Sequence, residues 1–153
     1  MMYTAREAVD IFKIWKTLVP AKIQASLTAA AELVKKEAED VIGHPQSEWP
    51  ALKDSTVALK ERYDWPANAP LLREGTMKAS IHMKLMPWEA VVYSNNPAMW
   101  FHETGTRYME KRGVLSLALY RNEAEINSLL GTTFCKMVFT SNIKYNLTSR
   151  KDL

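Results

Sequence analysis

The hydrophobic positions between residues 5 and 42 repeat with the period of a helix. Apolar or small residues recur at a mean spacing of about 3.7 residues, close to the ~3.6 of an α-helix, and they are Ala8, Phe12, Trp15, Val19, Ile23, Leu27, Ala30, Val34, Ala38 and Val41. Pro20 lacks an amide hydrogen and clashes with the preceding turn, so it kinks or splits a helix. We therefore predict a helix from about Ala5 to Leu18 and a second from Pro20 to Ile42. Gly43 is expected to end the second helix in the left-handed conformation.

The segment from residue 44 to residue 70 loses this period. It is rich in proline, tryptophan and polar residues, and so many aromatic side chains are not typical of disorder. We predict an ordered loop that Trp49 and Trp65 hold in place. One short helix is expected inside it, with Asp54 or Ser55 as its N-cap.

A hairpin is predicted next. Apolar and polar residues alternate from Ala79 to Met86, which is the pattern of a half-buried strand. Pro87-Trp88-Glu89 predicts a turn, and Ala90 to Ser94 predicts the returning strand. Asn95-Asn96-Pro97 has turn chemistry, and its proline is suited to the first turn of a short helix through Trp100, Phe101 and Glu103 that Gly105 ends.

The last part of the chain has a weaker pattern. Val114 to Tyr120 is a continuous apolar run, which fits either a buried strand or the start of a helix. Asn122 is predicted to cap a helix that ends near Gly131. Phe134 to Tyr145 alternates weakly, so we expect an edge strand or an extended arm there, with loose residues from Thr148 onward.

Together these elements predict an α+β fold, with a long N-terminal helical segment packed on a small, mainly antiparallel sheet with additional helices. The chain has 153 residues, and we expect a single domain over residues 1–140 followed by a C-terminal arm or tail over residues 141–153. A hydrophobic content of 47% and a charged content of 24% are ordinary for a globular protein. The net charge of +3 is too small to indicate nucleic-acid binding by itself.

The sequence lacks the patterns of common catalytic and metal sites. Its 5 glycines form neither a GxGxxG nor a GxxxxGK[ST] phosphate loop. His44, His82 and His102 are far apart, and no pair of them has metal-ligand spacing. The single cysteine excludes an internal disulfide and a cysteine-based zinc site. We therefore expect no catalytic residues, no metal, no cofactor and no enzymatic activity.

Three segments resemble small structural proteins of tailed bacteriophages. Leu71 to Ile81, which reads LLREGTMKASI, is similar to the "L-x-x-T-G-x-L-x-x-S-I" entry into a strand. Val91-Val92-Tyr93, then Met99 to Thr106 and Arg112 to Leu119, follow the order of a strand, a "Y-A-x-x-x-E-x-G-T" helix and a basic-then-apolar run. Upstream, Trp49-Pro50-Ala51-Leu52 with Thr56 resembles a "W-x-x-L-x-x-x-T" element. The chain thus resembles the tail-component and virion-morphogenesis family, whose members include tail-completion and neck proteins.

That resemblance implies a structural role in the virion, at the neck where head meets tail. A tail-completion or tail-terminator protein forms a ring, here expected to be a hexamer of this chain, that caps the tail tube and joins it to the head connector. The implied partners are other copies of the chain, a tail-tube protein and a head-closure or connector protein, with DNA passing through the lumen without specific binding and no membrane. Assembly would take place in the host cytoplasm. The alternative is a DNA-binding or packaging accessory protein, which short basic clusters such as Lys111-Arg112 and Arg150-Lys151 would serve.

The candidate interface residues are Trp88, Trp100, Glu103, Tyr108 and Arg112. Tryptophan, tyrosine and arginine are the residue types that most often dominate binding energy at protein interfaces. Glu103 is expected either to bind loop amides or to form an ion pair with Arg73 or Arg112, in the same or a neighbouring subunit. The alternative to both roles is an exposed carboxylate at the helix end. Each tryptophan is equally at home in a core, so exposure decides between the two interpretations.

Overall fold

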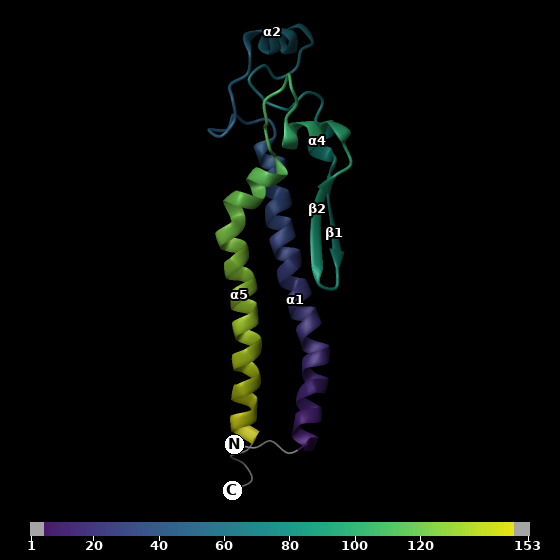
Figure 1. Cartoon of the computed structure of the whole chain (residues 1–153), viewed down its shortest axis with the longest axis vertical. Coiled ribbons are helices and arrows are strands. Elements are labelled where there is room, and N and C mark those ends of the chain that lie inside the picture. The colour runs from purple at the N-terminus through teal and green to yellow at the C-terminus, as the bar shows by residue number, and fades with distance from the viewer. Residues whose placement is uncertain (1–4, 149–153) are drawn as a thin grey trace. The chain divides into compact units, whose positions relative to one another are not determined.

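The computed structural model describes residues 5–148. Within that range the order of elements is α1 (Ala5–Val41), α2 (Asp54–Arg62), α3 (Thr76–Ala79), β1 (Ile81–Met86), β2 (Glu89–Ser94), α4 (Pro97–Thr104) and α5 (Leu115–Thr148) (Figure 1). The two strands form one antiparallel hairpin. The fold is α+β, as the sequence predicts.

The chain divides into two compact units. Unit 1 comprises residues up to Ala30, the hairpin segment Leu85–Ala90, and residues from Ala124 onward. Unit 2 comprises Ala31–Lys84 and Val91–Glu123. Both long helices contribute to both units, because α1 passes from unit 1 into unit 2 and α5 returns from unit 2 into unit 1.

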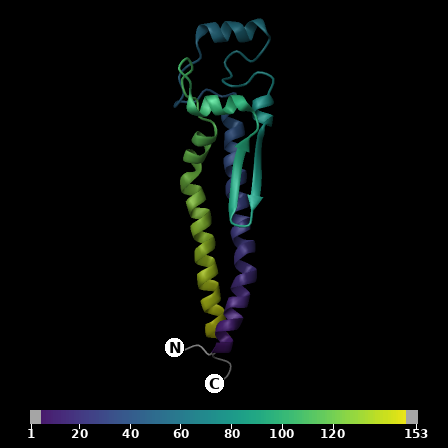
Figure 2. The same ribbon diagram turned by 45° about the vertical axis from the view of Figure 1, so that its right-hand side comes forward.

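In unit 1, the α1 and α5 segments lie side by side and antiparallel in both ribbon views (Figures 1 and 2). The hydroxyl oxygens of Ser26 on α1 and Thr133 on α5 lie 2.6 Å apart in a hydrogen bond. Pro20 lies inside α1, so the prediction of two separate helices was wrong. A long helix tolerates one missing amide hydrogen because the turns on either side keep their own hydrogen bonds.

The α1 part of unit 2 confirms the C-terminal half of the predicted stripe. Val34, Ala38 and Val41 are buried, whereas Lys36 between them is exposed. The buried hydrophobic residues of unit 2 come from five segments of the chain, and they are Ala31, Val34, Ala38, Val41, Ile42, Ala69, Ile81, Met99, Val114, Leu117 and Ala118. The stripe members Ala8, Phe12, Trp15 and Val19 lie outside the described side chains.

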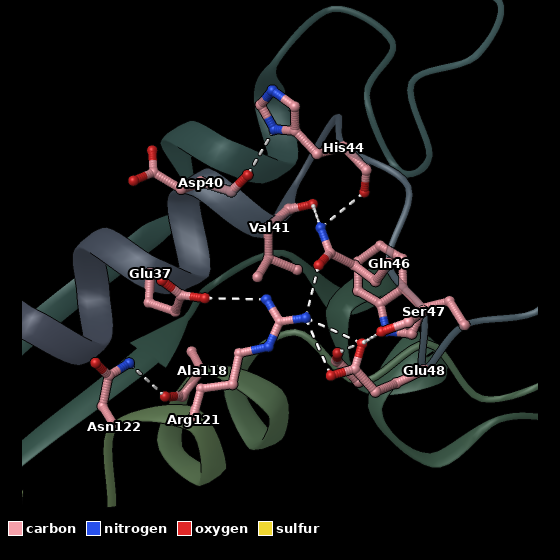
Figure 3. A network of polar contacts seen from close by, with 12 residues as sticks. Glu37, Asp40, Val41, His44, Gln46, Ser47, Glu48, Ala118, Arg121 and Asn122 are labelled. Carbon is pink, nitrogen blue, oxygen red and sulfur yellow. Dashed lines mark hydrogen bonds and ion pairs between the residues drawn. The ribbon is translucent and has the colours of Figure 1, made fainter.

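A polar network around Arg121 joins three segments of unit 2 (Figure 3). Its guanidinium donates from Nη1 to Glu37 Oε1 at 3.1 Å and from Nη2 to Gln46 Oε1 at 2.9 Å. Nη2 also lies 3.0 Å from both carboxylate oxygens of Glu48. One residue of α5 is thereby linked to α1 and to the loop that follows α1.

Helix α5 decides one open alternative and corrects three predictions for the C-terminal part of the chain. The apolar run that begins at Val114 leads into a helix rather than a strand, since α5 begins at Leu115. Asn122 is not an N-cap, because it lies inside α5 and its side chain donates to the carbonyl of Ala118 at 2.8 Å. Gly131 does not end the helix, and residues 134–145 form its continuation rather than an edge strand or an extended arm. Residues 149–153 lie outside the described part.

The shorter elements match their predictions more closely. Gly43 has a φ of 96° directly after the last turn of α1, as expected of a left-handed stop. Helix α2 exists, but its N-cap is Lys53, without a side-chain cap bond, and Asp54 is its first helical residue. The hairpin is present, although Ala79 belongs to the single turn α3 rather than to the first strand.

Candidate functional site

Helix α4 and the loop from residue 105 to residue 113 carry most of the predicted interface residues, and this backbone is well fixed. Asn96 caps α4, its side-chain oxygen accepting from the amide of Ala98 at 2.9 Å. Gly105 ends the helix with a φ of 76°, a conformation that favours glycine. Beyond it, Thr106 and Met109 exchange backbone hydrogen bonds of 2.8 and 3.2 Å. The loop therefore closes on itself.

Glu103 connects α4 to the start of α5. One of its carboxylate oxygens accepts hydrogen bonds from the amides of Val114 at 2.7 Å and Leu115 at 2.5 Å. Amides at the start of a helix have no partner within that helix, and they favour a negative charge. Of the two roles considered for Glu103, the structure shows the bond to loop amides.

Gly113 leaves room for this contact. A Cβ at residue 113 would lie 2.2 Å from the Ser116 hydroxyl oxygen and 3.2 Å from the second carboxylate oxygen of Glu103. A side chain here would push both groups away from the first turn of α5. The glycine that stands before the apolar run thus allows the carboxylate to reach the helix.

Arg112 ties the same loop to the segment after Trp49. Its Nη2 donates to the carbonyls of Pro50 at 3.0 Å and Ala51 at 3.2 Å. In the same region the indole nitrogen of Trp49 donates to the carbonyl of Gly113 at 3.1 Å. The Arg112 side chain is therefore engaged within its own chain, at least through this nitrogen.

The predicted aromatic residues are exposed. Trp100 is 68% exposed and Tyr108 is 85% exposed, and Phe101 between them is 51% exposed. We call Trp100, Phe101 and Tyr108 the aromatic surface of unit 2. Trp88, in the hairpin turn of unit 1, is 62% exposed. None of these side chains serves the core, so the interface interpretation of the tryptophans is favoured.

Tyr108 of the aromatic surface also lines an open pocket of about 760 Å³, built entirely from unit 2. Residues 50–60, 71–77 and 96–112 supply its walls. Its basic residues are Lys53, Lys60, Arg73, Arg107 and Arg112, and Glu110 is its only acidic residue. Tyr108 and His102 also line it.

Lys60 is the most unusual of the basic residues, because it is only 4% exposed. Its ammonium group donates to the carbonyls of Pro66 at 3.0 Å and Leu72 at 2.7 Å, and also to that of Ala69. Burial, with the nearby charge of Arg73, lowers the pKa of Lys60 from its ordinary value of 10.5. The amine holds the loop after α2 in place by filling the gap between its carbonyls.

His102 and Arg112 each have a buried nitrogen that lacks a hydrogen-bond partner among the described side chains. These atoms are Nδ1 of His102 and Nε of Arg112. Burial lowers the pKa of His102 from 6.5, and the positive charges of Arg112 and Arg73 lower it further, while Glu103 opposes them. The imidazole is therefore neutral near neutral pH.

Sequence reasoning missed most of this pocket. Arg73 was expected only as a partner for Glu103, and no pocket for an anion was predicted. The pocket assembles from segments far apart in the chain; the Arg112 and Pro50 contact joins residues 62 positions apart. The single signal for the pocket in the local sequence is that Arg107 and Arg112 both lie within a few residues of Tyr108.

Three further findings bear on the possible functions of the chain. No known protein family, curated protein or solved structure matches the chain. Among the described residues, no group of three or more His, Cys, Asp or Glu side chains is placed to hold a metal ion. The described helices include none long and apolar enough to cross a membrane.

Proposed function

We propose that this protein is a structural component of a tailed-phage virion, acting at the neck as a tail-completion or tail-terminator protein. Copies of the chain would form a ring, with six copies favoured, on the head-proximal end of the tail tube. The ring would stop growth of the tube and present a surface to the head connector. The order of sequence motifs from Trp49 to Leu119 is the basis for the phage assignment.

The observation that carries the structural role is the aromatic surface on a fixed backbone. Trp100 and Tyr108 are more than two-thirds exposed, yet the capped helix and closed loop that bear them are held by Asn96, Glu103 and Arg112. Large aromatic side chains presented on a rigid element lose little entropy on binding and contribute strongly to interfaces. Such a surface suits a protein whose work is to contact other proteins.

The genetic test removes the protein from a phage that encodes it. We expect filled heads and separate tails to accumulate, because neither part alone supplies the joint. Electron micrographs of the lysate would distinguish the two outcomes. Normal joined virions without this protein would rule out a neck role.

The biochemical test changes the aromatic surface without disturbing the bonds beneath it. In the double variant Trp100→Ser with Tyr108→Ser, both removed side chains are exposed, so the melting temperature is expected to stay near that of wild type. Light scattering should show loss of the ring, and head–tail joining should fail. The control is Tyr120→Ser, an equally exposed aromatic on α5. Ring formation by the double variant at wild-type levels would contradict this use of the surface.

A further inference from the structure

The pocket of unit 2 concentrates the positive charge of the whole protein. Five basic residues and one acidic residue line it, a net charge of about +4, while the complete chain has a net charge of only +3. The remainder of the chain therefore has a slight excess of acidic residues. The positive charge is concentrated in the pocket rather than distributed along one face of the protein.

The three arginines of the pocket are not neutralised by the protein's own acids. Among the described side chains, the ion pairs are those of Lys35 with Glu39 and of Arg121 with Glu37 and Glu48. Arg73 lies over the ring of Trp65 at 5.0 Å, and Arg107 lies over the ring of Tyr108 at 5.6 Å. These contacts orient each guanidinium and leave its donors available.

Two buried nitrogen atoms are a second observation about the pocket. Nε of Arg112 and Nδ1 of His102 lack partners among the described side chains, and both residues line the pocket. A buried N–H donor normally has an acceptor. Nε of Arg112 is always a donor, since a guanidinium in a protein does not lose its proton. Nε of Arg112 is therefore a donor without a described acceptor, and the positive charge around the pocket favours an anionic one.

We propose that the pocket binds carboxylate side chains of an acidic segment from a partner protein. Guanidinium groups match the two oxygens of a carboxylate with parallel hydrogen bonds. The exposed Tyr108 on the pocket wall favours a protein as the source, because aromatic side chains and arginine together are typical of protein interfaces. A nucleic-acid duplex would instead call for basic residues along an extended surface, and the charge balance outside the pocket is slightly acidic.

The test measures binding of a fluorescent hexaglutamate peptide by anisotropy at low salt. Wild-type protein is expected to bind hexaglutamate at least tenfold more tightly than hexaglutamine. Inorganic phosphate and a duplex DNA should compete only at much higher concentration. No preference for hexaglutamate over hexaglutamine, or tighter binding of phosphate or DNA than of the peptide, would overturn the proposal.

The variant that tests the pocket is Arg73→Gln with Arg107→Gln. Both side chains are exposed and hold no described hydrogen bond of the fold, so the melting temperature checks that the fold is intact. Affinity for hexaglutamate should fall at least tenfold. The control, Arg62→Gln with Lys36→Gln, removes the same charge outside the pocket and should retain affinity within about twofold. Equal loss in both variants would show nonspecific attraction and refute the site.

A third variant separates charge from geometry. Arg112→Lys keeps the positive charge but removes Nε and the bonds from Nη2 to Pro50 and Ala51, so its melting temperature is measured alongside. We expect a several-fold loss of affinity at an unchanged slope against salt, and unchanged affinity would show that the guanidinium of Arg112 takes no part in binding. The peptide assay needs neither a phage nor a ring. The pocket can therefore fail while head–tail joining is intact, and the neck role can fail while the peptide binds.

Discussion

The carboxylate of Glu103 makes the sharpest prediction about stability. It accepts hydrogen bonds from the two amides at the start of α5, at 2.7 and 2.5 Å, and Val114, which donates one of them, is fully buried. Hydrogen bonds to a charged group contribute about 1.5–3 kcal/mol each, and a negative charge at a helix N-terminus adds about 0.3–1 kcal/mol. Partial exposure of Glu103 lowers these values. We expect Glu103→Ala to lower the free energy of unfolding by about 2–4 kcal/mol.

Glu103→Gln separates the contribution of the negative charge to stability from that of the hydrogen-bond acceptor. The amide oxygen of glutamine still accepts, so about half of the loss is expected, or about 1–2 kcal/mol. Urea unfolding followed by circular dichroism measures both variants, with Glu110→Gln as the control because that carboxylate is exposed and holds no described amide. If Glu103→Ala unfolds at the same urea concentration as the control, the carboxylate does not anchor α5 and the reasoning is wrong.

Three other substitutions are expected to give measurable results. Lys60→Met should lower the free energy of unfolding by about 2–5 kcal/mol in urea titrations, because three carbonyls lose their shared donor; an unchanged midpoint would contradict it. Val34→Asp should unfold the protein in thermal melts, because it buries a charge, whereas the exposed Lys36→Asp should melt near wild type. The pKa of His102 is lower in the folded state than the ordinary 6.5, so below pH ~6.5 the unfolded state binds more protons than the folded state. The contribution of His102 to the free energy of unfolding should therefore be fully present above pH ~6.5 and be lost as the pH drops towards the folded pKa. His102→Gln should flatten this dependence in urea titrations at pH 5.5 and 7.5, and the exposed His82→Gln should preserve it.

The elements that the sequence predicted well are those whose signals are local. The buried side of α1 follows from spacing alone, and the hairpin follows from alternation interrupted by Pro87. Helix α4 was predicted because Pro97 is suited to its first turn and Gly105 stands at its end, where a left-handed backbone is needed. In each case a few neighbouring residues decide the conformation.

The full length of helix α5 was missed because its local signals oppose its structure. Asn122 and Gly131 usually mark the ends of helices, yet both lie within this one. Gly131 has open space around it, and a glycine in a helix costs only about 1 kcal/mol. Packing against α1 in unit 1, including the Ser26–Thr133 contact, offsets that amount. Such long-range contacts are not visible in a short window of sequence.

The candidate site was predicted in part. Exposure of Trp100 and Tyr108 agrees with the expectation for an interface, and one of the two roles considered for Glu103 is the one observed. Arg112 instead contacts carbonyls more than sixty positions away. The pocket depends on folding to bring Arg73 together with Arg107 and Arg112, and local spacing could have indicated only the last two.

The buried amine of Lys60 can be used to measure local motion of the protein by chemical labelling. Amine-reactive reagents modify lysines only where they can reach the nitrogen, and a buried nitrogen held by three carbonyls offers little access. Lys60 can be labelled only when the loop from residue 63 to residue 72 opens, so its labelling rate measures the frequency of that local opening rather than of global unfolding. Exposed lysines such as Lys36 and Lys53 would react at once and serve as internal standards.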